Sequence, residues 1–364
     1  MGSWWRLLRE GRFRIHPLKY GMTFLGSGCS VFNSTCAAMQ SATMHRSIMK
    51  TELIEPPVFI VGHWRSGTTL MHELFSLDNS WASPDNYDAF APHHVLATGW
   101  LFKRLVKSLL PGKRPMDSMS LKADAPQEDD FALISLGAPT PYHDIAFCSN
   151  RRKPSPLLAL DLADEETQNR TRESLDYFFR VLTRLYGRRL VLKSPPHTGR
   201  IALLAKWFPE ARFVHMSRDP MSLVPSTMKL WRALDATQGF QLQRYDDSQL
   251  LDYINTAGRS LYDAYFRQRP EIDDSRICEV AFEELIERPV ETVADTFERL
   301  HLELPPGLSD AVASYFGQRK TKPTSKPVRD ERLREEIESH WQPYLQAFGY
   351  TVPSTPVPAV TSRC

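Results

Sequence analysis

The chain has 364 residues, of which 42% are hydrophobic, so it can bury a sizeable core as one large domain or two small ones. Its formal net charge is only +2, which argues against a nucleic-acid partner and makes any anion site a local feature. The five cysteines are odd in number and lack paired metal-ligand spacing. We therefore expect no disulfide framework and no zinc site, and a reducing, cytoplasmic compartment fits best.

The first 50 residues are predicted to form a helical lead-in, because apolar side chains recur there at approximately helical spacing, and we expect these side chains to pack. The positions are Phe24, Leu25, Val31, Phe32 and Met39. No run of about 18 apolar residues occurs, so no transmembrane helix is predicted. Trp4, Trp5 and nearby arginines leave peripheral membrane contact as an alternative to a purely cytoplasmic location.

Residues 51–350 are predicted to form one α/β domain, in which strands and helices alternate around a mainly parallel sheet. The runs interpreted as strands are Val58–Val61, Leu190–Leu192, Phe213–Met216 and Ile277–Ala281. Helical patterns cover Thr69–Leu77, 164–186, Ile201–Trp207 and Val293–Leu300. Residues 81–156 are rich in Pro, Ser, His and aromatic residues, which predicts irregular segments that line a substrate pocket. Residues 351–364 are predicted to be disordered.

The segment Gly62–Thr69 lies between a buried strand and a helix, the setting in which backbone N–H groups and a helix N-terminus bind an anion. A nucleoside-triphosphatase loop reads G-x-x-x-x-G-K-[ST], but Thr68 occupies the lysine position here and the cation is Arg65. This difference disfavours magnesium-dependent nucleotide hydrolysis. A guanidinium with backbone donors suffices for a phosphosulfate, so we expect no metal.

The order Arg65, Ser66, Gly67, Thr68, Thr69 resembles the 5′-phosphosulfate loop of sulfotransferases, particularly those of the bacterial carbohydrate and protein type. The resemblance covers residues 56–350. It implies a P-loop-type three-layer fold with a central, mainly parallel sheet flanked by helices. It also implies 3′-phosphoadenosine 5′-phosphosulfate (PAPS) as co-substrate, with its phosphosulfate held by Arg65 through Thr69.

The strand Phe213–Met216 is followed by Arg218, and Ser226 comes eight residues after that arginine. Sulfotransferases carry a similar strand, arginine and downstream serine that bind the 3′-phosphate of the donor. The resemblance therefore assigns the 3′-phosphate to Arg218 and Ser226. Lys193 ends another strand and resembles the family lysine that approaches the bridging oxygen of the donor, at the edge of a parallel sheet where ligands bind.

Two C-terminal segments also resemble parts of the family. The basic run Arg319–Lys322 with Lys326 is interpreted either as a loop that closes over the nucleotide or as a solvated charged loop. Residues 340–350 resemble the closing helix of bacterial sulfotransferases.

The general base is the least determined residue of the predicted site. Protein- and carbohydrate-type relatives place a carboxylate some way after the loop cation, and Asp88 falls in that window, so it is the first choice. His94 and the adjacent His93 are alternatives, since imidazole titrates near neutrality. His197 follows Lys193 as a histidine does in cytosolic relatives, but the intervening Pro195-Pro196 departs from their pattern. We interpret the acidic cluster 128–130 as a helix N-terminus in preference to a catalytic carboxylate.

The predicted function is in-line transfer of a sulfuryl group from PAPS to a hydroxyl-bearing acceptor, which could be a sugar, a lipid or a phenol. Two alternatives remain at this point. One is a magnesium-dependent nucleotide phosphotransferase, and the other is a non-catalytic nucleotide-binding protein of the same fold. The sequence indicates neither the acceptor nor an oligomeric state.

Overall fold

The computed structural model describes residues 2–109, 125–148, 153–318 and 331–351. Within these ranges, five strands form one parallel sheet in the order β2-β3-β1-β4-β5. The strands are β1 (Val58–Gly62), β2 (Trp81–Ala82), β3 (Arg189–Lys193), β4 (Arg212–Ser217) and β5 (Ile277–Ala281). Val58 of β1 stands opposite Val191 of β3 on one side and Arg212 of β4 on the other. After β1 the chain forms β2 and β3 on one side of it and then crosses to β4 and β5 on the other side. The strand order therefore reverses beside β1, and the crevice at its carboxyl end is the expected ligand position.

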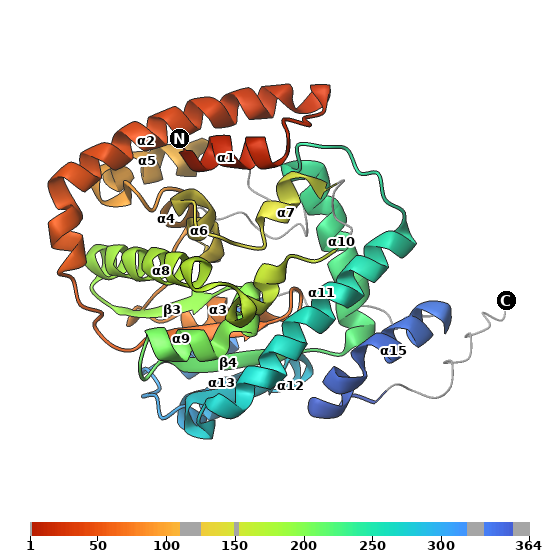
Figure 1. Cartoon of the computed structure of the whole chain (residues 1–364). Coiled ribbons are helices and arrows are strands. Elements are labelled where there is room, and N and C mark those ends of the chain that lie inside the picture. The colour runs from red at the N-terminus through yellow and green to blue at the C-terminus, as the bar shows by residue number, and fades with distance from the viewer. Residues whose placement is uncertain (1, 110–124, 149–152, 319–330, 352–364) are drawn as a thin grey trace.

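The helices cover both faces of this sheet (Figure 1). In the first half of the chain they are α1 (Gly2–Glu10), α2 (Tyr20–Met49), α3 (Thr68–Phe75), α4 (Asn86–Phe90), α5 (Val95–Leu109), α6 (Asp130–Leu136), α7 (His143–Ala146) and α8 (Glu165–Tyr186). In the second half they are α9 (Ile201–Trp207), α10 (Pro220–Gln238), α11 (Asp247–Gln268), α12 (Phe282–Glu287), α13 (Pro289–Arg299), α14 (Leu308–Gln318) and α15 (Glu331–Ala347). Short 3₁₀ turns include η1 (Pro17–Lys19), η3 (Pro156–Leu162) and η4 (Pro195–Arg200).

Alternation along β1 explains the layers. Phe59 and Val61 point into one apolar cluster, which is completed by side chains of α8, α9, α10, α11 and α15. Val58 and Ile60 point into a second cluster, completed by α3, α12, α13 and α14. Successive side chains of a strand face opposite sides, so a run that is apolar at every position requires helices on both faces. The arrangement confirms the predicted three-layer α/β fold.

The four predicted strands are all present as β1, β3, β4 and β5. The helices predicted after β1, β3 and β5 are present as α3, α9 and α13. The sequence did not reveal β2, which is two residues long and lies in a segment interpreted as irregular; that segment also contains α4 to α7. Residues 319–326 and 352–364, to which a nucleotide-closing loop and a disordered tail were assigned, lie outside the described residues.

The N-terminal 50 residues contain α1, η1 and α2, in agreement with the helical pattern. However, the apolar side chains expected to pack, from Phe24 to Met39, are exposed. The periodicity was correct, but the inward face of α2 is a different one, carrying Gln40 and Ile48. Among the described residues no helix has the length and apolar character needed to cross a membrane.

Candidate functional site

The loop Gly62–Thr69 follows the central strand β1 and leads directly into α3. Two glycines shape it. Gly62 has φ of 137°, and a Cβ there would lie 2.4 Å from the Met216 carbonyl oxygen. Gly67 has φ of 104°, and a Cβ there would lie 2.5 Å from the Phe282 ring. Only glycine fits both requirements, so the backbone is drawn close to β4 and α12 at this point.

The N-terminus of α3 offers donors to an anion. Gly67 is its N-cap and has no side chain with which to accept from the first-turn amides. The Ser66 hydroxyl is buried, and its oxygen has no hydrogen-bond partner among the residues that the structure describes. A buried hydroxyl without a partner is costly in a finished core but is expected where a ligand completes the bonding. The loop therefore fits a phosphate or sulfuryl oxygen.

Arg65, Arg218 and Ser226, predicted from separate sequence segments, are brought together. Arg65 Nε donates to Ser226 Oγ at 2.9 Å, and Arg218 Nη1 donates to the Arg65 carbonyl oxygen at 2.9 Å. The Arg218 guanidinium also lies over the Phe282 ring, 4.4 Å from its centre. Burial lowers the pKa of Arg218, and the Glu283 carboxylate opposes that effect. Two partly buried guanidinium groups at one place form a site for an anion.

The C-terminal helix α15 and the residues after it hold the end of β4. The Tyr344 hydroxyl accepts from the Arg218 amide at 2.9 Å and donates to the Arg218 carbonyl oxygen at 3.1 Å. The Tyr350 hydroxyl bonds with Ser217 at 3.2 Å and donates to Glu283 at 2.9 Å. Residues 340–350 thus fix the backbone that carries Arg218.

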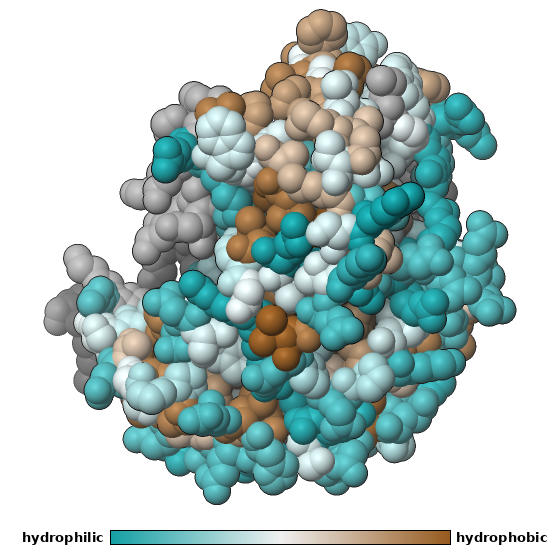
Figure 2. Space-filling view, turned by 90° about the vertical axis from the view of Figure 1, so that its left-hand side faces the viewer, coloured by the Kyte–Doolittle hydropathy of each residue, from teal (hydrophilic) through white to brown (hydrophobic). Residues whose placement is uncertain are grey.

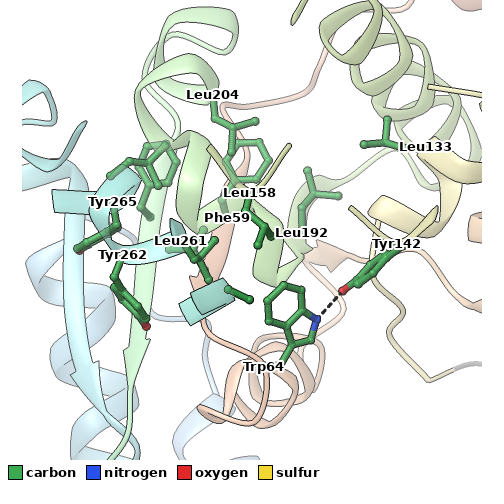
Figure 3. Close-up of a cluster of buried hydrophobic side chains, with 14 of the residues drawn as sticks. Phe59, Trp64, Leu133, Tyr142, Leu158, Leu192, Leu204, Leu261, Tyr262 and Tyr265 are labelled. Atoms are coloured by element: carbon green, nitrogen blue, oxygen red, sulfur yellow. Dashed lines mark hydrogen bonds between the residues drawn. The ribbon is translucent and has the colours of Figure 1, made fainter. Parts of the chain in front are cut away.

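Lys193, at the end of β3, lies in a chain of hydrogen bonds that starts from the loop. Trp64 Nε1 donates to the Tyr142 hydroxyl at 3.0 Å, and the Tyr142 hydroxyl donates to Glu128 Oε2. Figure 3 shows the indole pointing at the phenol oxygen. Lys193 Nζ donates to the other oxygen, Glu128 Oε1, at 2.7 Å. The lysine is buried, whereas 15% of the Glu128 side chain remains exposed. A strand-terminal ammonium and a solvent-reachable carboxylate are therefore adjacent.

The next two acids, Asp129 and Asp130, are fully buried beside His197 and Arg200. His197 Nε2 lies 2.6 Å from Asp129 Oδ2, and Arg200 Nε donates to His197 Nδ1 at 2.9 Å. Arg200 also donates to Asp130. Because Nδ1 accepts, the imidazole proton belongs on Nε2, and both ring nitrogens are engaged. Burial favours a higher pKa for Asp129, but His197 and Arg200 outweigh it, so the pKa is lowered.

This buried group includes three residues whose oxygen or nitrogen atoms lie within 4.8 Å of one another: Asp129, Asp130 and His197. Their spacing would suit a metal ion, but Arg200 already bonds to two of them. A cation is thus supplied by the chain itself. The cluster was interpreted as helix capping, yet the N-cap Asp129 makes no side-chain capping bond. Its side chains anchor the segment that presents Glu128.

Asp88 and His94, the sequence-based candidates for the base, lie on other elements. Asp88 forms a capping box with Asp85 and accepts from Tyr186 on α8. Lys103 of α5 lies 2.6 Å from its other oxygen. Burial raises the pKa of Asp88 to about 6. His94 bonds with Thr98 at 2.7 Å and with Asn33 of α2 at 3.2 Å. Neither set of partners includes the loop, β3 or β4.

The chain is similar to known proteins over nearly its whole length. A model described as "Sulfotransferase family" matches residues 56–306, which include the loop, Glu128, Lys193 and Arg218. Omega-hydroxy-beta-dihydromenaquinone-9 sulfotransferase Stf3 of Mycobacterium bovis is 32% identical over 366 residues, covering 98% of this chain and 91% of the relative. The protein of the same name from Mycobacterium tuberculosis matches equally.

Two solved structures share the fold. Sulfotransferase STF9 from Mycobacterium avium has a TM-score of 0.67 and 20% identity, covering 87% of this chain and 82% of that chain. Sulfotransferase STF1 from Mycobacterium tuberculosis has a TM-score of 0.65 and 16% identity, covering 92% and 90%.

Proposed function

The chain belongs to the sulfotransferase family and is thus an enzyme of sulfuryl transfer to a hydroxyl group, and we propose that PAPS is its donor and a hydroxylated apolar lipid its acceptor. The observation that carries the donor assignment is the meeting of Arg65, Arg218 and Ser226 beside the buried Ser66 hydroxyl. PAPS has two anionic ends, and this arrangement offers one set of donors to each. Arg65 and residues 66–69 hold the phosphosulfate, while Arg218 and Ser226 hold the 3′-phosphate.

The proposed mechanism assigns one task to each neighbouring side chain. Glu128 accepts the proton of the acceptor hydroxyl as its oxygen attacks sulfur. Lys193 stabilises negative charge on the bridging oxygen while the bond between sulfur and that oxygen breaks. The ion pair, with Lys193 Nζ 2.7 Å from Glu128 Oε1, holds the carboxylate beside the ammonium group. Tyr142 fixes the second carboxylate oxygen.

We propose Glu128 as the base in preference to Asp88 and His94. Asp88 is fully buried, and its partners lie on α5, on α8 and at the start of α4, away from the loop, β3 and β4. His94 likewise bonds with Thr98 on α5 and Asn33 on α2. A base must lie within hydrogen-bond reach of the reacting hydroxyl, and Glu128 already touches Lys193. In this proposal Asp88 stabilises the helix pair α4 and α5.

The acceptor class is proposed from the relative whose name states a hydroxylated menaquinone acceptor and which aligns over 98% of this chain. The magnesium-dependent phosphotransferase is not favoured, because the matching family model describes sulfotransferases. In addition, Thr68 occupies the position of the lysine that a nucleoside-triphosphatase loop requires.

The test uses donor labelled on the sulfuryl sulfur and three acceptors: a quinol lipid with a terminal hydroxyl, a phenol and a sugar. We expect label to move to the lipid and the product mass to rise by one sulfuryl group. Label on the phenol or sugar alone would overturn the lipid assignment. Calorimetry with adenosine 3′,5′-bisphosphate tests the donor separately, because failure of that nucleotide to bind would overturn the PAPS assignment.

A further inference from the structure

The outward side of α2 has no charge along most of its length. No Asp, Glu, Lys or Arg occurs between Lys19 and Arg46. The exposed residues include Phe24, with 84% of its surface accessible to solvent, and Leu25, with 67% accessible. Val31, Phe32 and Met39 continue this exposed stripe at helical spacing. An isolated exposed apolar residue needs no explanation, but a contiguous stripe of this kind marks an interaction surface.

Basic residues border the stripe at its N-terminal end. Of the charged residues in 1–50, Glu10 is the sole acid. The exposed cations of α1 and the following turn are Arg6, Arg9, Arg12 and Arg14. Large apolar side chains are interspersed with them, namely Trp5, Phe13 and Leu18, the last 80% exposed. We call α1, η1 and α2 with these side chains the N-terminal face.

The N-terminal face is held in place by specific contacts on its inner side. Gln40 is fully buried, and its amide donates to the Tyr177 hydroxyl on α8 at 3.1 Å. Its carbonyl oxygen accepts from the Leu96 amide of α5 at 2.9 Å. Near the other end, Trp4 Nε1 of α1 donates to Ser27 Oγ at 3.0 Å. The inward contacts of α2 thus include polar ones, while a row of large apolar side chains points outward.

We propose that the N-terminal face docks onto the surface of an anionic lipid bilayer. An apolar stripe beside a basic cluster complements a membrane whose interior is apolar and whose headgroups are negative. Since no described helix can cross a membrane, α2 would lie in the interface plane. Figure 2 shows brown and pale side chains gathered over the upper part of the molecule, where α2 lies, and mostly teal side chains below. Trp100, on the adjacent α5, is also 73% exposed.

The face also lies next to the elements that present the proposed base. Ser3 of α1 packs against Gly137 at the end of α6, which begins two residues after Glu128. A cavity of about 180 Å³ separates α1 from α7 and is lined by Leu7, Gly11 and His143 among others. His143 directly follows Tyr142 in the chain. A docked enzyme would thus meet a lipid hydroxyl on the side of Glu128. The docking proposal stands apart from the proposed function, because it requires no particular acceptor.

Vesicle flotation of the full-length protein tests the proposal. The probes are vesicles of phosphatidylcholine alone and vesicles with one third phosphatidylglycerol. We expect flotation with the anionic vesicles, weakened at high salt. Phe24→Ser combined with Leu25→Ser should weaken partitioning at least about tenfold. The matched control Leu162→Ser changes a side chain that is 72% exposed on η3 and should leave partitioning unchanged.

Two outcomes would overturn the docking surface: a wild-type protein that stays with the unbound fraction on both vesicles, or equal losses in the double variant and the control. Light scattering tests whether the N-terminal face instead binds a second copy of the chain. That result would be a wild-type protein that is dimeric and does not bind vesicles, together with a double variant that is monomeric. Binding of adenosine 3′,5′-bisphosphate to both variants should match the wild type, which distinguishes lost docking from a misfolded or failed donor site.

Discussion

Replacing Glu128 by glutamine removes the proposed proton acceptor while keeping the size of the side chain. Glutamine can still present an oxygen to Lys193, which now lies 2.7 Å from Glu128 Oε1, and an amide to Tyr142. General-base catalysis typically contributes about 10²–10⁴-fold in rate. We therefore expect Glu128→Gln to lower kcat by that factor, equivalent to about 3–5 kcal/mol in the activation barrier. Donor affinity should stay within about twofold, because no phosphate ligand is removed.

The assay compares two acceptors that differ in the acidity of the reacting hydroxyl. One is the hydroxylated lipid, and the other is the same lipid with fluorines beside its hydroxyl group. An acidified hydroxyl needs less help in losing its proton, so the ratio of wild-type to variant kcat should shrink for the fluorinated acceptor. Glu166→Gln is the matched control, because it makes the same chemical change at an exposed position of α8.

The reasoning is refuted if the ratio is the same for both acceptors. Glu128 would then act only by positioning Lys193, and its effect would depend on the leaving oxygen. A loss of donor affinity as large as the loss of kcat would also contradict the assignment, since it would place Glu128 among the donor ligands.

Four further outcomes follow from the described contacts. Lys193→Met should lower kcat by about 10²–10³-fold, the usual cost of one transition-state donor, in single-turnover assays at saturating donor; an unchanged rate would exclude it from the chemistry. Arg218→Ala should weaken adenosine 3′,5′-bisphosphate binding by about 10–100-fold in calorimetry, since charged hydrogen bonds contribute about 1.5–3 kcal/mol, whereas Arg232→Ala at the exposed pair with Asp247 should not. Gly67→Ala should destabilise the fold by over about 1 kcal/mol in urea and weaken donor binding, because its φ of 104° and the Phe282 ring oppose a Cβ; unchanged stability would contradict the loop geometry. The raised pKa of Asp88, about 6 against 3.8, means that the native state binds more protons than the unfolded state between about pH 4 and 6. Stability therefore falls as pH rises through this window, by up to about 3 kcal/mol from this group, and Asp88→Asn should remove that dependence from denaturation curves measured across it.

The residues proposed to bind the donor could be selected from the sequence because their signals are local. Gly62–Thr69 is continuous in sequence, and Arg218 with Ser226 lies on one strand-to-helix passage. Each element could be recognised without knowing its neighbours. Their proximity then follows from the parallel order, in which β1 pairs with both β3 and β4.

The proposed base, Glu128, could not be selected in the same way. Glu128 meets Lys193 across 65 residues of chain, and nothing in its local pattern distinguishes it from the two acids that follow. The number of consecutive acids was the feature that could have indicated a site. One acid suffices to cap a helix, whereas three acids in a row beside an apolar segment require partners for their charges. Arg200 and His197 provide them, from the turn after β3. For α2, periodicity gave the helix but not its inward face, because both faces lack charge.

The bond between Arg65 Nε and Ser226 Oγ has a consequence for turnover. It joins the residue assigned to one end of the donor with a residue assigned to the other. A nucleotide held by both would compete with this internal contact, and its departure would allow the contact to re-form. Under the proposed assignments, this internal contact would lower the affinity for product as well as for donor. A sulfotransferase built in this way gives up some tightness of binding and gains faster release at the end of each cycle.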